Sequence, residues 1–300
     1  MKRYTAIMAT SHPDKHGDRL ARSALAQLAD SVRNSLIPMN VEHDPRGGPC
    51  GRVLSAEVRE RADGEYEVAA DVEIFDGPVD KIQDGREIVQ QRNQPSGTLT
   101  VTWDRSYLDQ ADQELITELA EAIGADTNQE YKKAAEPLSI LWLIAGFLGV
   151  AGSSFAAGFF GKMGSDSWDL AKKKLSQLME RKAASQDEFL LILSTHVGHP
   201  HHDHVVEVDV CITNPSEHLV ESFWEEGVPQ LDSVLPRYVE ASTELRKLFF
   251  EYDSNGIRLK YGVRFDCAPI EFSQSTQEVL RANTGNIEQD HSADARTSRG

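Results

Sequence analysis

The chain has 300 residues, a formal net charge of -17 and 40% hydrophobic residues. This length is enough for two modest domains, each with its own apolar core. The acidic excess argues against nucleic acid as a partner, because binding to phosphates depends on Lys and Arg. The N-terminus, MKRYTAIMATSHPDKHGD, has no apolar run typical of a secretory signal, so we expect a cytoplasmic protein. Cys50, Cys211 and Cys267 lack the spacing of a zinc site or a disulfide framework, and we expect no cofactor.

Residues 1–108 are expected to form a compact β-rich domain. Leu20, Leu25, Leu28 and Val32 recur at helical spacing, which predicts a helix within residues 19–36. The stretches GRVLSAEVRE, EYEVAADVEIF and TLTVTW alternate in polarity, as strands do.

Two motifs in this domain resemble the tailed-phage prohead (capsid maturation) proteases. They are HPDKHGDRLARSAL and, after it, IPMNVEHDPRGGPCGRVLSAEV, and the similarity extends over residues 8–108. The resemblance implies a β-barrel-like fold with a serine nucleophile activated by a histidine. It places His43 as the base, and it places Thr100, in TLTVTW, at the position of the nucleophile.

The threonine departs from the pattern of that family. Its methyl group stiffens the side chain and crowds the attack geometry. Two alternatives therefore stay open for this domain: a serine/threonine peptidase that uses His43 and Thr100, or a catalytically inactive scaffold that binds a phage structural protein.

The stretch from Pro137 to Gly161 contains no charged residue. After a polar connector at 109–136, we expect residues 137–163 to form a central glycine-rich apolar helix that can insert into membrane lipid. Small residues spaced four apart favour self-association there. The residues assigned to this membrane-active segment are Leu141, Trp142, Ile144, Gly149, Gly152, Ala156, Gly158 and Phe159. The alternative is a buried core helix, or a helical hairpin, between two globular domains.

The last part of the chain predicts an amphipathic helix at 164–186, a small α+β domain at 187–273 and a disordered tail at 274–300. In VVEVDVCIT one side of a strand carries Val206, Val208, Val210 and Ile212, and the other carries Glu207 and Asp209. Residues 196–204 carry five histidines in a turn between two strands. His199, His201 and His204 have the chemistry of metal ligands, although a pH-sensitive or solvated turn fits the same residues.

These patterns lead to two functional hypotheses within an α+β fold class. In the first, an inactive prohead-protease-like domain senses a phage component and releases the apolar helix. The helix then oligomerises as a pore in the inner membrane, giving antiphage abortive infection. In the second, the chain is a prohead-protease-type peptidase. Membrane lipid, a second copy of the chain and a phage structural protein are the expected partners under the first hypothesis.

Overall fold

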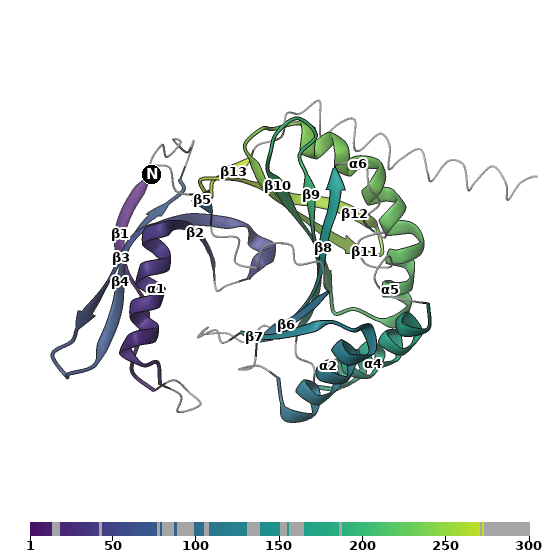
Figure 1. Cartoon of the computed structure of the whole chain (residues 1–300), viewed down its shortest axis with the longest axis horizontal. Helices are drawn as coiled ribbons and strands as arrows, with labels where there is room; N and C mark the ends of the chain where they lie inside the picture. The colour runs from purple at the N-terminus through teal and green to yellow at the C-terminus, as the bar shows by residue number, and fades with distance from the viewer. Residues whose placement is uncertain are drawn as a thin grey trace, which may run out of the picture.

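A computed structural model describes residues 1–13, 19–41, 44–76, 79, 87–88, 99–104, 108–130, 139–150, 155, 165–185, 188–270 and 272. Two β-sheets, one of five strands and one of eight, organise these residues. Figure 1 shows the smaller sheet with α1, and the larger sheet with α2, α4, α5 and α6 along its outer side.

The N-terminal part of the chain forms the smaller sheet, in the order β1-β4-β3-β2-β5. Its elements are β1 (Lys2–Thr10), α1 (Arg22–Asn34), β2 (Ser35–Asn40), β3 (Pro49–Glu60), β4 (Tyr66–Ile74) and β5 (Glu87–Ile88). Helix α1 covers one face of this sheet because Leu25, Ala29 and Val32 form a buried stripe at helical spacing. The stripe packs on the residues of β3 and β4 that share one face, namely Val53, Ala56, Val68, Ala70 and Val72, and a register shift between Val53 and Ser55 keeps Ala56 on that face. These strands form an open sheet, with β1 and β5 at its two edges, rather than the β-barrel-like arrangement expected from the resemblance.

The larger sheet has the order β13-β12-β11-β10-β9-β8-β6-β7. Its strands are β6 (Thr100–Asp104), β7 (Asp126–Glu130), β8 (Ser139–Val150), β9 (Phe189–Gly198), β10 (Val205–Thr213), β11 (Leu245–Asp253), β12 (Gly256–Arg264) and β13 (Pro269–Ile270). Three pairs of neighbours are parallel: β6 with β7, β8 with β9, and β10 with β11. A helical connection joins the strands of each pair, as parallel neighbours require. These connections contain α2 (Gln110–Ile123), α4 (Ser165–Ser185), and α5 (Glu217–Ser222) with α6 (Val228–Glu240).

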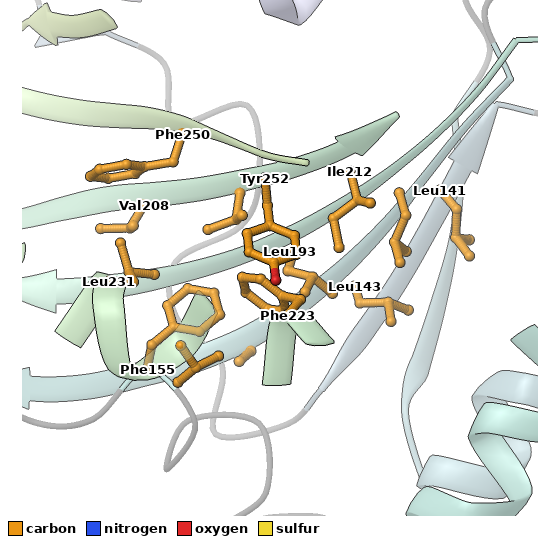
Figure 2. Close-up of a cluster of buried hydrophobic side chains, with 14 of the residues drawn as sticks. Leu141, Leu143, Phe155, Leu193, Val208, Ile212, Phe223, Leu231, Phe250 and Tyr252 are labelled. Atoms are coloured by element: carbon orange, nitrogen blue, oxygen red, sulfur yellow. The ribbon is translucent and has the colours of Figure 1, made fainter. Parts of the chain in front are cut away.

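The main apolar core lies between the larger sheet and these helices. Figure 2 shows Leu141 and Leu143 of β8 in one layer with Leu193, Val208 and Ile212, facing Phe223 and Leu231. Phe155 is completely buried in this layer, and its backbone N–H donates to Asp232 Oδ1 of α6 at 2.6 Å. A π-helical turn, Phe223–Gly227, joins α5 to α6.

The prediction of a central apolar helix at 137–163 is wrong. Residues 139–150 form β8, an interior strand that pairs with β6 on one side and β9 on the other. Alternate side chains of β8 are buried on both faces: Leu141 and Leu143 toward the helices, and Ile140 and Trp142 on the opposite face. A strand buried on both faces reads as a continuous apolar run, so its sequence resembles that of a membrane segment. Among the described residues, no helix is both long enough and apolar enough to cross a membrane.

The other residues assigned to the membrane-active segment divide into two groups. Ile144 and Gly149 also belong to β8. Gly152, Ala156, Gly158 and Phe159 lie outside the described residues.

The boundaries of the two sheets differ from those of the expected segments. β6, which carries TLTVTW, belongs to the larger sheet, and the stretch 109–136 contains α2 and β7. The segment 164–186 contains α4. The tail at 274–300 lies outside the described residues.

Candidate functional site

The face of the larger sheet opposite its helices meets the N-terminal part of the chain. An apolar patch on this face consists of Ile140, Trp142, Leu190, Ile192, Cys211 and Phe249. Burial raises the pKa of the Cys211 thiol to about 12, so this cysteine is an inert packing residue rather than a nucleophile.

The segment that follows His43 is fixed to this face. A 3-10 turn (Pro45–Gly47) begins at Asp44, whose carboxylate accepts from the Arg46 backbone N–H at 2.9 Å. The Tyr261 hydroxyl, on β12, donates to the Pro45 carbonyl at 2.5 Å. Gly48, at φ +70°, lies over the Tyr261 ring, where a Cβ would be 3.0 Å from Cδ1. A glycine is therefore needed here both for its backbone conformation and for the close approach.

Arg46 links this turn to the entrance of β9. Its guanidinium donates to both carboxylate oxygens of Glu188, at 2.6 and 2.9 Å, and also to Asp44. Burial alone would raise the pKa of Asp44, but the hydrogen bonds and the charge of Arg46 outweigh it and lower that pKa. Asp44 therefore serves to anchor the turn. His43 itself lies outside the described residues.

A buried ionic network joins the two sheets nearby. Arg52 of β3 is only 2% exposed, and it donates to Glu73 of β4 at 2.9 Å and to both the carbonyl and the carboxylate of Asp266, at 3.0 and 3.2 Å. Asp266 also accepts from Arg264 at 2.8 and 3.0 Å. Burial acts to raise the pKa of Asp266, but the hydrogen bonds and charge of Arg264, with the charge of Arg52, lower it overall. Asp266 is thus held as a carboxylate between two arginines.

Thr100 lies on the same face of the larger sheet. It is directly opposite Ile144, and Thr102 is directly opposite Trp142 of the apolar patch. Four strands, β11, β10, β9 and β8, separate β6 from Tyr261 on β12. β6 is paired on both edges, with β7 and with β8.

A row of polar side chains, which the sequence did not predict as a site, lies on the same face of the larger sheet. It contains Ser194 and His196 of β9, Glu207 and Asp209 of β10, and Lys247 of β11. The register places His196 opposite Glu207 and Ser194 opposite Asp209. Lys247 Nζ donates to Glu207 Oε1 at 2.9 Å and to Asp209 Oδ2 at 2.6 Å.

Ser194 and His196 are completely buried. Within the described residues, the Ser194 hydroxyl and both ring nitrogens of His196 have no hydrogen-bond partner. Burial is the main cause that lowers the pKa of His196, so its imidazole is neutral at pH 7. Each polar group buried without a partner costs about 1–3 kcal/mol. These side chains can offer hydrogen bonds to a small polar molecule, and in its absence they weaken the sheet.

The histidine turn lies at the end of the β9–β10 hairpin. The ring of His199 is 4.8 Å from those of His202 and His204, measured between ring centroids. His199 Nδ1 accepts from the backbone N–H of His201 at 3.1 Å, so the ring proton is on Nε2. A ligating histidine needs the opposite arrangement, with a free lone pair toward the metal and a proton donated from its other nitrogen. Across the described residues, no group of three or more His, Cys, Asp or Glu side chains is placed to hold a metal ion.

No protein-family model, curated protein or solved structure matches the chain. The function therefore has to be argued from the geometry and from the sequence motifs.

Sequence reasoning missed the polar row because its members come from three strands. The alternation in β10 predicts one apolar and one solvent-facing polar side, yet Glu207 and Asp209 are both buried. A signal that could have found them is the match of opposite charges: Lys247 precedes LFF in β11, and Glu207 and Asp209 alternate with valines in β10.

Proposed function

We propose that the chain is a non-catalytic recognition protein of bacterial antiphage defence. Its N-terminal region, which resembles prohead proteases, binds a phage structural component in the cytoplasm, where capsids assemble. The resemblance of residues 8–108 supports this choice of partner. Release of an apolar helix has no part in the proposal, because the stretch assigned to that helix begins with β8.

The observation that carries the non-catalytic part is the pairing of β6. An acyl-transfer enzyme needs backbone N–H groups or other donors aimed at the developing oxyanion, next to the nucleophile. Thr100 lies in a strand with ladders on both edges, opposite Asp126 of β7 and Ile144 of β8. The amides around Thr100 are therefore engaged between strands, and this supports a retained scaffold rather than a peptidase.

Infection of bacteria that express the chain tests the proposal. We expect protection against some tailed phages, and we expect phage mutants that escape protection to carry substitutions in capsid, scaffold or maturation-protease genes. The absence of protection against a broad panel, or escape mutations only in unrelated genes, would overturn the choice of partner.

Two variants at one position separate recognition from catalysis. Thr100→Val removes the hydroxyl but keeps the shape, and Thr100→Ser restores the serine of the family pattern. Under the proposal both variants protect as well as the original chain, and purified capsid proteins stay intact when incubated with any of the three. Loss of protection with Thr100→Val, together with cleavage of a capsid protein by the serine variant, would instead establish a peptidase.

A further inference from the structure

β1 is an edge strand whose outer side is open. It pairs with β4 on one side, and no strand among the described residues pairs with its other side. Of the five large apolar side chains that are exposed in the described part of the chain, three belong to β1 or directly precede it: Met1, Tyr4 (53%) and Ile7 (50%). An edge strand of this length, with no charge beyond its first two residues, is a ready template for pairing with another strand.

The sequence of β1 carries few features that prevent such pairing. From Tyr4 to Thr10 there is no charged residue and no proline. Only a bulge between Ile7 and Ala9 and the two cations at the start, Lys2 and Arg3, interrupt a flat edge. The strong negative charge of the chain opposes self-association, but β1 itself carries no carboxylate that would add to this repulsion.

The charges at the two ends of β1 are complementary to each other. Lys2 and Arg3 stand at its beginning. Among the described residues, the N-terminus, Lys2 and Arg3 at the beginning face Asp76 and Glu73, which leaves an excess of one positive charge. Near the end, Asp63, Glu65 and Glu67 of β4 and the turn before it face Arg19 and Arg61, which leaves an excess of one negative charge. In an antiparallel pair of identical strands, the cationic end of each strand meets the acidic end of the other.

We propose that two copies of the chain associate through β1, antiparallel and about a two-fold axis normal to the sheet, so that the two five-stranded sheets become continuous. The opposite net charges at the two ends favour a second copy in this antiparallel arrangement, because each cationic end then lies next to an acidic end. The exposed Tyr4 and Ile7 then pack against the neighbouring strand.

Sedimentation velocity of the full chain over about a hundredfold concentration range tests this inference. We expect a monomer–dimer equilibrium, and Ile7→Lys should weaken it by about tenfold or more, because it sets two ammonium groups near the two-fold axis. Leu170→Lys is the matched control. It changes an aliphatic side chain of similar exposure (47%) on α4, and it should leave the dimer unchanged.

Hydrogen exchange locates the contact and does not depend on the proposed function. The amides of residues 4–10 should exchange more slowly as the protein concentration rises, and this protection should disappear in Ile7→Lys. A chain that stays monomeric throughout, or a dimer that Ile7→Lys does not affect, overturns the inference. Protection of β1 only on addition of a phage component also overturns it, because the edge would then serve that partner.

Discussion

Replacing Arg52 by methionine tests whether the ionic network holds the two sheets together. Glu73, 3% exposed, would lose two contacts with Arg52, at 2.9 and 2.6 Å. Among the described residues it would keep one cation, Arg3, which is 73% exposed and 3.2 Å away. Asp266 would keep Arg264. Removal of one partner from a buried ion pair costs about 3–5 kcal/mol, and we expect about 3 kcal/mol because each carboxylate retains one arginine.

Two spectroscopic probes can follow the unfolding of this variant in urea. The four tryptophans all lie between Trp103 and Trp224, so their fluorescence reports the larger sheet, whereas circular dichroism reports both sheets. In the original chain the two transitions should coincide. In Arg52→Met the dichroism should begin to change first, because the smaller sheet loses its attachment, and the melting temperature should fall by about 6–12 °C.

Two further variants decide how such a result is read. Arg59→Met removes an exposed partner of Glu57 on the same strand, and it should change stability by less than about 1 kcal/mol. Arg52→Met combined with Glu73→Leu removes the buried carboxylate that has lost Arg52 and should recover most of the loss. If Arg52→Met costs no more than Arg59→Met, and the two probes still coincide, the network does not hold the sheets together and the reasoning is refuted.

Two other predictions concern the larger sheet. Gly227→Ala would place a Cβ 2.7 Å from Tyr252 Cε2 and 2.8 Å from Phe223 Cδ2 in the π-helical turn, so it should cost about 1–3 kcal/mol in urea unfolding. Gly47→Ala is the control, because a Cβ added there would meet no neighbouring atom within 4 Å, and it should change stability very little. Equal losses of stability in Gly227→Ala and Gly47→Ala would contradict the packing of the π-helical turn. Burial lowers the pKa of His196, so below about pH 6.5 the unfolded chain binds a proton that the folded chain does not. The free energy of unfolding therefore decreases as the pH falls below this value. Urea midpoints at pH 7.5 and 5.5 measure this loss, which His196→Leu should reduce; an unchanged difference would place the pH dependence elsewhere.

Local patterns in the sequence located most elements but not their surroundings. The alternation in GRVLSAEVRE and EYEVAADVEIF corresponds to β3 and β4, and the stripe of Leu25 and Val32 lies on the inner face of α1. The stretch from Pro137 predicts a membrane helix but forms β8, because length and apolarity do not separate a membrane helix from a strand buried on both faces. Only the identity of its neighbours, β6 and β9, resolves that ambiguity.

The site depended on contacts that no local pattern encodes. Arg52 and Asp266 are 214 residues apart, and Tyr261 and Pro45 are 216 residues apart. Each of these side chains looks like an ordinary surface or turn residue when it is read with its sequence neighbours alone. The two parts of the chain come together through single long-range pairs, and a reading of one sequence has no signal for such pairs.

The position of β8 also affects the chain during synthesis. Its antiparallel neighbour β6 is made before it, but its parallel neighbour β9 begins only at Phe189. Because synthesis adds about 5–20 residues per second, one edge of β8 stays unpaired for several seconds before β9 has been made. A nascent chain, or one cut short before Phe189, presents to chaperones and lipids the side chains that the finished protein buries. This apolar stretch is thus exposed only while the chain is unfinished, and completion of the larger sheet buries it.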